Sequence, residues 1–558
     1  MPKPITENTL FYGDNLPILR EYIPDESIDL VYLDPPFNSN RTYNVLFKQE
    51  SGQDSEAQIA AFEDTWHWNQ AAEETYHELV TAAPPHVGKM IGALRGFIVG
   101  SQTGGNQMMA YLVMMAARLV ELHRILKPTG SLYLHCDPTA SHYLKVVLDT
   151  IFGPTCFINE IVWERSQTRS SISKSYRRAH DILFFYAKSP DYLFNMQFRS
   201  LSDASLENYR HEDEKGRYRL VPLLVSGVRK GVTGRPWRGV DPNIQGKSGM
   251  HWVTTHEKLD EYERQGLVVI SRNGIPNLKY YLEQSPGVPL NDNWHDITLI
   301  PASSKEALGY PTQKPIALLE RIIAASSNPG DIVLDPFCGC GTTIAAAQKL
   351  DRRWVGIDIT YLSIALQKNR LNTAFPDAKY KVIGEPTTLH DARQLAVDDR
   401  FQFQWWAVSL IKARPYGGQE GSKQGKKGAD KGIDGIIIFI DDHTRQPKRV
   451  IVQVKSGKVN SRDIRDLVGT LNRESAAIGV FLTLEEPTRD MRTEATTAGF
   501  YHSPGWNQKY PRIQILTVKA LLEGTARLEM PPAEFTTFKQ AQQVKEEEHT
   551  QKGLFDQL

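Results

Sequence analysis

The stretch DIVLDPFCGCGTT, residues 331–343, decides the fold of this chain. Its first five residues have the composition of a buried strand, and residues 342–350 (TTIAAAQKL) are typical of a helix. The turn between them contains Gly339 and Gly341, which let backbone N–H groups approach a ligand at the positive end of the helix. The next segment, RWVGIDI (353–359), is again strand-like, so the order predicts a βαβ unit and a parallel sheet.

Two acidic residues end the predicted strands on either side of this glycine turn. Asp335 ends the first strand, and Asp358 ends the second about twenty residues further on, where an acceptor for ribose hydroxyls belongs. The spacing differs from the dinucleotide fingerprint GxGxxG, and an Asp before the helix is more typical of a pocket for S-adenosylmethionine. We expect Asp335 to face the amino group of that cofactor and Asp358 its ribose. A glycine turn that only packs a helix on a strand is the alternative.

A second loop also follows a strand-like run, IDLVYLD (28–34), and reads Asp34-Pro35-Pro36-Phe37. The two prolines lack N–H groups and make the loop rigid, so its carbonyl oxygens stay free as acceptors. An aromatic exocyclic amine is a poor nucleophile, because its lone pair is delocalised into the ring. If the Asp34 carboxylate and the Pro35 carbonyl accept its two hydrogens, the lone pair can point at a methyl donor. Phe37 offers a face on which a flipped-out base can stack. A purely structural turn is the alternative.

Together, these two loops resemble the N6-adenine/N4-cytosine amino-methyltransferases of DNA, in the permuted order in which the catalytic loop precedes the cofactor loop. YPTQKPIALLERII (310–323) resembles the cofactor motif that precedes the glycine turn in that family, and FYGDN (11–15) resembles the motif whose Asp contacts the cofactor's adenine. The resemblance covers about residues 1–375. It implies that S-adenosylmethionine is bound by Asp14, Gln313, Lys314, Pro315, Asp335, Phe337, Gly339, Gly341, Thr342 and Asp358.

The motifs predict methylation of an exocyclic amine more clearly than they predict which base carries that amine. A leading Asp in the catalytic loop is more typical of adenine and a leading Ser of cytosine, so adenine in DNA is the expected target. N4-cytosine, RNA and a small metabolite stay open as alternatives. A 5-methylcytosine enzyme is disfavoured, because that class attacks the ring with a cysteine that follows a proline, and none of Pro35, Pro154 and Pro336 is followed by cysteine.

The expected fold class is α/β: a Rossmann-like methyltransferase sheet with an inserted target-recognition region, followed by a smaller α/β domain. Residues 50–108 show few regular signals and are interpreted as an insertion or lid. Basic stretches at 165–178 and 229–238 favour phosphate contacts, and Trp163, Trp237 and Trp252 suit base contacts unless they pack a core. The predicted boundaries are a catalytic half at 1–164, target recognition at 165–300, a cofactor half at 301–375, a linker at 376–400, a restriction-endonuclease-like domain at 401–525 and a tail at 526–558.

The endonuclease-like domain is predicted from Asp434, before one strand, and from Gln453 and Lys455 at the end of the next. Their spacing resembles the Mrr-like PD-(D/E)xK nucleases, in the variant with Gln at the middle acidic position. The resemblance implies Mg²⁺ held by Asp434 and Gln453, with Lys455 beside the attacking water. The neutral Gln453 weakens metal affinity, so an inactive DNA-binding remnant and an unrelated α/β domain stay open. A basic, Gly-rich stretch at 412–431 precedes Asp434, where a DNA backbone would lie.

Composition limits the remaining choices. The 558 residues carry 65 Lys+Arg and 65 Asp+Glu, so net charge alone says nothing about nucleic acid, and four cysteines make no disulfide framework. No signal pattern or bilayer-length apolar run is present, so a cytoplasmic protein is expected. Double-stranded DNA is the expected partner. The chain has no GxxxxGK[ST] loop, so a helicase or restriction subunit would be separate, and a homodimer is also considered. The leading hypothesis is an adenine methyltransferase fused to a metal-dependent nuclease, and the alternative is a methyltransferase with a non-cleaving DNA-binding or partner-docking module.

Overall fold

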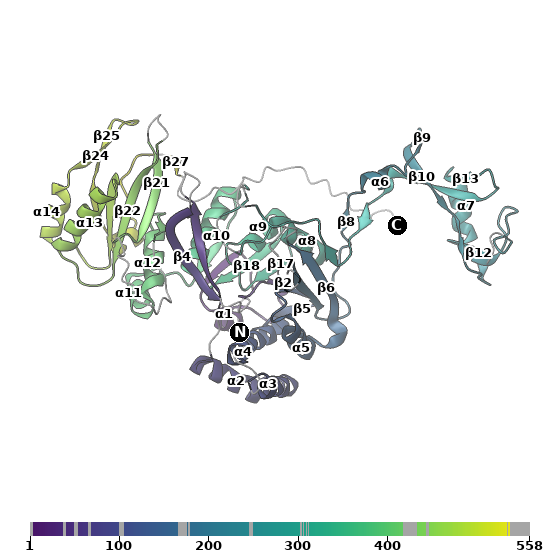
Figure 1. The fold of residues 1–558 in the computed structure, drawn as a ribbon, viewed down its shortest axis with the longest axis horizontal. Helices are drawn as coiled ribbons and strands as arrows, with labels where there is room; N and C mark the ends of the chain where they lie inside the picture. Colours follow the sequence, from purple (N-terminus) through teal and green to yellow (C-terminus); the bar gives the residue numbers. More distant parts are fainter. Residues whose placement is uncertain are drawn as a thin grey trace. The chain divides into compact units, whose positions relative to one another are not determined.

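The fold is taken from a computed structural model of the chain. It describes residues 4–36, 41–48, 54–64, 68–99, 105–165, 174, 176, 179–244, 249–301, 304, 306–308, 310, 312–416, 432–441, 446–532 and 534–535. The chain divides into two compact units, one formed by residues 1–195 with 292–558 and the other by residues 196–291. Figure 1 labels the helices and strands used below. Within the described ranges, no helix is both long enough and apolar enough to cross a membrane.

The larger unit is built on a nine-stranded sheet with the order β16-β6-β7-β5-β2-β17-β18-β1-β19. Most neighbours are parallel, as the βαβ pattern predicts, but β7 runs antiparallel to both β5 and β6. The prediction of a purely parallel sheet is therefore corrected to a mixed one. The strands are β1 (Thr9–Tyr12), β2 (Ile28–Leu33), β5 (Leu126–Cys136), β6 (Phe157–Glu164), β7 (His180–Ala187), β16 (Asn293–Trp294), β17 (Ile332–Asp335), β18 (Arg353–Asp358) and β19 (Lys381–Ile383).

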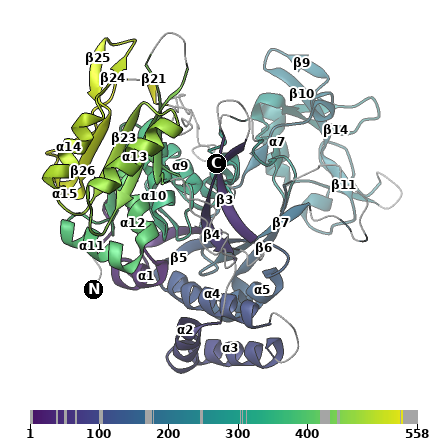
Figure 2. The ribbon, with the colours of Figure 1, turned by 60° about the vertical axis from the view of Figure 1, so that its left-hand side comes forward.

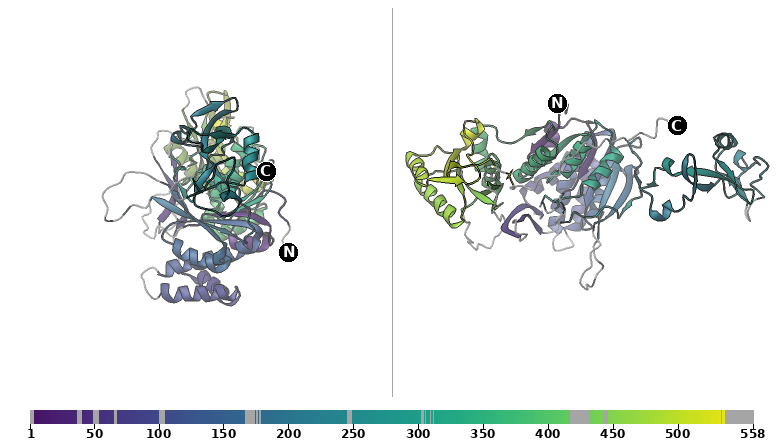
Figure 3. Two further views of the ribbon diagram at one scale, coloured as in Figure 1. Left: turned by 90° about the vertical axis from the view of Figure 1, so that its right-hand side faces the viewer. Right: turned by 90° about the horizontal axis from the view of Figure 1, so that it is seen from above.

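Helices cover both faces of this sheet (Figure 3). The alternation along β2 shows why: Val31 and Leu33 are buried in one hydrophobic cluster, whereas Leu30 and Tyr32 are buried in another. The first cluster contains α1 (Asn15–Tyr22), α4 (Gly105–Ile125) and α5 (Ser141–Phe152), and the second contains α8 (Ile316–Ser326), α9 (Thr342–Lys349) and part of α10 (Tyr361–Ala374). A strand buried on both faces reads as a continuous apolar run, as IDLVYL does.

The segment 50–108, interpreted as an insertion or lid because its sequence shows few regular signals, contains more regular structure than those signals indicated. This part of the chain contains β4 (Asp54–Asp64), which pairs antiparallel with β3 (Arg41–Lys48), and the helices α2 (Gln70–Thr81) and α3 (Pro85–Ile98). The two helices pack on α4, on the side away from the sheet (Figures 1 and 2). Their apolar positions are spaced for one helix face, with Val87, Ile91, Leu94 and Ile98 of α3 buried, a pattern that glycines and prolines in the segment obscured.

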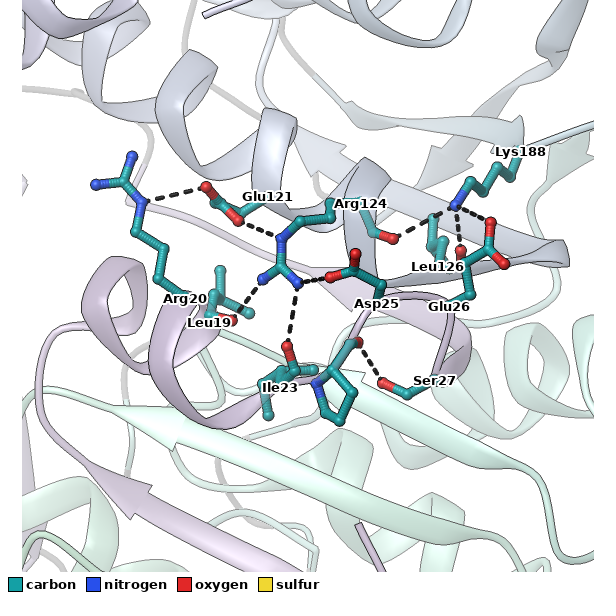
Figure 4. Close-up of polar contacts among 11 residues, drawn as sticks. Leu19, Arg20, Ile23, Asp25, Glu26, Ser27, Glu121, Arg124, Leu126 and Lys188 are labelled. Carbon is teal, nitrogen blue, oxygen red and sulfur yellow. Dashed lines mark hydrogen bonds and ion pairs between the residues drawn. The ribbon is translucent and has the colours of Figure 1, made fainter. Parts of the chain in front are cut away.

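A cluster of polar contacts fixes the amino end of β2 (Figure 4). The Arg124 guanidinium of α4 donates to the carbonyl oxygens of Leu19 in α1, at 2.8 Å, and of Ile23, the residue after α1, at 3.2 Å. Nearby, Lys188 Nζ donates to the Leu126 carbonyl at 2.5 Å, where α4 passes into β5. These contacts satisfy backbone oxygens at helix ends. They also hold α1, α4 and β5 together around the start of the strand that leads to Asp34.

The smaller unit, residues 196–291, lies within the region 165–300 predicted for target recognition, whereas β7 and β16 of the same region belong to the central sheet. In this unit Trp237 and Trp252 form a buried edge-to-face pair with ring centroids 5.5 Å apart, and in the sheet Trp163 is fully buried. All three tryptophans therefore pack cores, and their interpretation as base contacts is wrong. The unit's elements are β8 (Phe198–Arg199), α6 (Asp203–Leu206), β9 (His211–Asp213), β10 (Gly216–Pro222), β11 (Leu224–Ser226), β12 (Met250–Trp252), α7 (His256–Arg264), β13 (Val268–Ile270), β14 (Pro276–Tyr281) and β15 (Val288–Pro289).

The carboxyl-terminal part of the larger unit forms a second sheet with the order β20-β21-β22-β23-β26. The segment 376–400, expected as a linker, contains β19, which joins the central sheet, and a helix, α11. The basic stretch 417–431 and most of the tail lie outside the described residues. The elements are α11 (Leu389–Asp398), α12 (Arg400–Ser409), β20 (Arg414–Pro415), β21 (Gly435–Ile440), β22 (Lys448–Lys455), α13 (Ser461–Arg473), β23 (Ile478–Thr483), α14 (Arg489–Thr497), β24 (Phe500–Ser503), β25 (Gln508–Pro511), β26 (Ile513–Thr517), α15 (Val518–Leu522) and β27 (Glu534–Phe535).

Candidate active site and cofactor pocket

The Asp-Pro-Pro loop and the glycine turn lie side by side at the carboxyl ends of neighbouring strands in the central sheet. Strands β1, β2, β17 and β18 are parallel neighbours there, so the residues that follow them lie side by side. They surround a cavity of about 160 Å³. Its lining includes Gly13, Asp14, Asn15, Tyr32, Asp34, Pro35, Pro36, Arg118, Tyr310, Gln313, Lys314, Asp335, Phe337, Gly339, Thr342 and Asp358. Phe37 lies outside the described residues, so its stacking role stays a prediction.

The glycine turn has the geometry that its sequence predicted. Gly339 and Gly341 have φ angles of +50° and +76°, in the region that favours glycine. A Cβ added at Gly341 would lie 2.8 Å from Cγ of Gln367, and one at Gly339 would lie 3.3 Å from the ring of Tyr310. Gln367 Nε2 in turn donates to the Gly339 carbonyl at 2.7 Å. The turn is therefore closely packed from behind, and side chains on these residues would deform it.

Asp335 is buried behind the glycine turn. Its carboxylate accepts hydrogen bonds from the Thr343 hydroxyl at 2.6 Å and from the Phe337 N–H at 3.0 Å. Burial raises the pKa of Asp335 to about 7, although these two hydrogen bonds oppose the shift. A cationic ligand beside a carboxyl group with such a pKa favours its ionised form, so binding of the cation and ionisation of Asp335 promote each other.

Asp358 ties the glycine turn to the next loop. It accepts from the Gly339 N–H at 2.8 Å and from both the N–H and the hydroxyl of Thr360 at 2.9 Å. Burial raises the pKa of Asp358 to about 6, against these hydrogen bonds. The side chain predicted to hold a ribose thus also holds together the two loops on either side of it.

Lys314 was predicted as a cofactor contact, but its ammonium group forms an ion pair with the carboxylate of Asp34. Both side chains are largely buried, with exposed fractions of 10% for Lys314 and 16% for Asp34. Because the two residues are 280 positions apart in the chain, sequence spacing could not reveal the pair. The contact orients the Asp34 carboxylate, which lines the cavity.

Of the other predicted cofactor residues, Asp14, Gln313 and Thr342 line the cavity, whereas Pro315 is not among its lining residues. Asp14 caps α1 by accepting from the Leu16 N–H at 2.9 Å, and it forms an ion pair with Arg118 at 2.7 Å. Gln313 uses both ends of its amide on the segment before it, accepting from the Leu308 N–H and donating to the Glu306 carbonyl, each at 2.7 Å. Thr342 is the first residue of α9, and Pro315 is the residue before α8. Their roles toward a cofactor stay predictions.

Sequence reasoning missed a chain of buried polar contacts that starts at Tyr32, two residues before Asp34. The Tyr32 hydroxyl lies 3.1 Å from Nδ1 of His135, and Nε2 of His135 lies 3.2 Å from the Asp181 carboxylate. Asp181 also pairs with Arg165 at 3.4 Å. The four residues come from β2, β5, β7 and the end of β6, so only the strand order brings them together. Neither His135 nor Asp181 belongs to a recognisable motif, so no local pattern in the sequence indicates their contact.

The acidic lining of the cavity and its glycine turn suit S-adenosylmethionine. That cofactor carries a sulfonium and an ammonium cation, and the carboxyl groups of Asp14, Asp335 and Asp358 line the cavity. The glycine turn brings backbone to its wall without side chains, at the amino-terminal end of α9. The residues present therefore suit the cofactor that the sequence implies.

The predicted nuclease residues come together differently in the second sheet. The Asp434 carboxylate accepts from Nε2 of Gln404 at 2.5 Å and from the Val454 N–H at 2.6 Å. The side-chain oxygen of Gln453 is buried and has no hydrogen-bond partner among the described residues, and Lys455 is half-buried at the end of β22. Within the described ranges, no three His, Cys, Asp or Glu side chains form a group that could hold a metal. One carboxylate that already serves two N–H donors does not fit the Mg²⁺ site that the sequence implied.

Two family models match the chain. A model described as DNA methylase (N6_N4_Mtase) matches residues 28–366, and one described as NACHT-associated inactive restriction endonuclease 1 matches residues 416–523. The second description agrees with the endonuclease-like interpretation of this domain. It supports neither the Mrr-like assignment nor cleavage.

Three relatives of known name align with the methyltransferase region. The type II methyltransferase M.EcaI of Enterobacter cloacae is 30% identical over 356 residues, 63% of this chain and 67% of that protein. The StyLTI Mod subunit, a type III restriction-modification enzyme of Salmonella typhimurium, is 27% identical over 68% of this chain, and the match spans only 56% of its own length. The DNA adenine methyltransferase YhdJ of Escherichia coli is 24% identical over 66% of this chain and 83% of that protein. Given the family model and these relatives, the chain belongs to the N6/N4 DNA methylase family.

Proposed function

We propose that this protein transfers a methyl group from S-adenosylmethionine to the N6 amine of adenine in double-stranded DNA, as the modification enzyme of a restriction-modification system. The observation that carries the proposal is the position of Asp34-Pro35-Pro36 at the rim of the cavity that holds the glycine turn. An Asp at the head of this loop favours adenine over cytosine. The name of the Escherichia coli relative, an adenine methyltransferase, supports the same target.

We assign some residues of the cavity to the target base and others to the cofactor. The cofactor supplies an electrophilic methyl group when bound. The Asp34 carboxylate and the Pro35 carbonyl accept hydrogen bonds from the target amine, which turns its lone pair toward that methyl group. Lys314 keeps the Asp34 carboxylate in place through their ion pair. The Asp335 carboxylate interacts favourably with the cofactor's positive charge, and the Asp358 carboxylate accepts hydrogen bonds from its ribose.

The test is the identity of the modified base. Unmethylated duplex DNA is incubated with the full-length protein and S-adenosylmethionine, digested to nucleosides and analysed by mass spectrometry. We expect N6-methyladenine with the wild type and none with Asp34→Ala. N4-methylcytosine as the sole product would contradict the adenine assignment but leave the amine chemistry intact. No methylated base with any DNA would contradict both.

We further propose that the carboxyl-terminal domain works without cleaving DNA. The supporting observation is the engagement of Asp434 with Gln404 and Val454, which leaves no acidic cluster for Mg²⁺ among the described residues. The test uses supercoiled plasmid, methylated and unmethylated, with Mg²⁺ or Mn²⁺. We expect no nicking by the wild type, Asp434→Ala or Lys455→Ala. Cleavage by the wild type that disappears in both variants would establish the nuclease instead.

Cleavage, where it accompanies this methylase, would then belong to another subunit. The relative from Salmonella typhimurium is named as the Mod subunit of a larger enzyme, and this chain lacks a nucleotide-binding GxxxxGK[ST] loop. Purification of the tagged chain from its native host tests the point. A helicase- or nuclease-containing partner at equal stoichiometry would support it, whereas a chain that purifies alone and protects host DNA would show that modification is independent.

A further inference from the structure

The cofactor pocket and the carboxyl-terminal domain share one hydrophobic core. Tyr310, Cys340 and Tyr361 from the cofactor half are buried in the same cluster as aromatic side chains of α12 and apolar side chains of β21, β22 and β23. Two of these residues, Tyr310 and Cys340, also line the cavity. Clustering of contacts accordingly places both regions in one compact unit. The carboxyl-terminal domain thus packs against the back of the pocket.

One hydrogen bond crosses from that domain to the loop behind Asp358. Helix α10 begins at Tyr361, directly after Thr360, whose side chain is bonded to Asp358. The N–H at the first position of a helix has no acceptor within the helix. Oε1 of Gln402, in α12, accepts from the Tyr361 N–H at 3.1 Å. A residue 41 positions further along the chain therefore satisfies the start of a helix that follows the cofactor loop.

The loop that follows β1 also contacts the start of α10. Tyr12 lies at the end of β1, just before Gly13 and Asp14, which line the cavity. Its ring packs against that of Tyr361, with centroids 3.8 Å apart and the ring planes tilted by 32°. Burial, followed by the charges of Asp399 and Asp358, raises the pKa of Tyr12. Tyr361, whose N–H donates to Gln402, thus also contacts the residue that precedes this second loop of the pocket.

We propose that Gln402 is a positioning residue for the cofactor pocket, and that the carboxyl-terminal domain completes this pocket. By capping α10, Gln402 fixes the turn from Asp358 to Thr360. The Asp358 carboxylate at the start of that turn accepts from the N–H of Gly339 and so holds the glycine turn. The inference rests on the proposed function, since it concerns the site assigned to S-adenosylmethionine. It gives a domain that does not cleave DNA a physical role in methylation.

The test compares the same substitution at two positions of one helix. Gln402→Met keeps the length of the side chain and removes the acceptor. Gln404→Met is the matched control, because that side chain faces Asp434 and not the pocket. Gln402→Glu keeps an acceptor oxygen and should restore the wild-type behaviour. Affinity for S-adenosylmethionine is measured by calorimetry on the full-length protein, alongside kcat and the KM values for cofactor and DNA.

We expect Gln402→Met to weaken cofactor affinity and raise the KM for the cofactor about three- to tenfold, the usual consequence of one lost hydrogen bond. The kcat at saturating cofactor and the KM for DNA should stay close to wild type, as should all values for Gln404→Met. Wild-type affinity in Gln402→Met would overturn the inference, as would parallel losses for cofactor and DNA, which indicate general destabilisation. A wild type that fails to bind the cofactor at all would overturn the proposed function instead.

Discussion

The methylase pocket and the endonuclease-like site place similar side chains at the ends of strands but leave them in different states. At the pocket, Asp34 has a cationic partner and faces a cavity, and burial raises the pKa of Asp335 to about 7. In the second sheet, the Asp434 carboxylate accepts from Gln404 and from the Val454 N–H. The first arrangement gathers several acids around a cavity, two of them with pKa values raised by burial, whereas the second uses its acid to hold a helix against a strand. Motif spacing locates both, and only the contacts tell them apart.

The largest effect should follow from removing the acid that faces the target amine. Asp34→Ala should lower kcat about 10²- to 10⁴-fold, because lone-pair activation and orientation act in the transition state. Cofactor affinity should stay near the wild-type value, since Asp34 is assigned to the base. Single-turnover methylation and calorimetry on the same preparation measure the two quantities. A variant that methylates DNA at nearly the wild-type rate would show that this loop is structural, like the contacts of Asp434.

The next effect concerns the glycine turn. Gly341→Val should weaken S-adenosylmethionine binding at least tenfold, about 1.4 kcal/mol, because the turn has a positive φ and no room beside Gln367. Gly330→Val is a matched control: its φ is +86° and open space surrounds it, so it shares the backbone strain without the close packing. Asp358→Ala should lose affinity to a similar extent. Unchanged calorimetric affinity in both Gly341→Val and Asp358→Ala would disprove the pocket as placed.

A smaller effect should appear in the pH dependence of cofactor binding. Burial raises the pKa of Asp335 to about 7, so this carboxyl is largely protonated at pH 5.5 and ionised at pH 8. A cationic ligand favours the ionised form, so affinity should rise with pH over this window, by roughly three- to tenfold, and protons should be released on binding. Calorimetry in buffers of different ionisation enthalpy counts those protons. In Asp335→Asn the rise should shrink to the part contributed by Asp358, whose pKa is about 6. An identical pH profile in this variant would assign the titration to another group.

The sequence predicted the parts of the fold that depend on local patterns. The glycine turn, the Asp-Pro-Pro loop and the alternation of strands and helices are all encoded within short windows, and the structure brings them to one cavity. The pair of Asp34 with Lys314 and the cap of Tyr361 by Gln402 depend instead on which strands become neighbours. The sequence could not assign Trp163, Trp237 and Trp252 for a related reason. An aromatic ring suits a protein core as well as a contact with a base, and only the burial of the side chain distinguishes the two roles.

The smallest effect separates the two sites most directly, because at the endonuclease-like site we expect none. A metal that binds only the folded state stabilises it by about 2.7 kcal/mol at a hundred times its Kd. If Asp434 only joins Gln404 to the Val454 N–H, millimolar Mg²⁺ should leave the free energy of unfolding of the wild type unchanged. Asp434→Ala serves as the control, since its unfolding should be equally insensitive to the metal although the variant itself is less stable through its lost hydrogen bonds. Chemical denaturation with Mg²⁺ or with a chelator measures all four conditions. Stabilisation of the wild type by Mg²⁺ that disappears in Asp434→Ala would contradict the structural role and would support Mg²⁺ binding at Asp434.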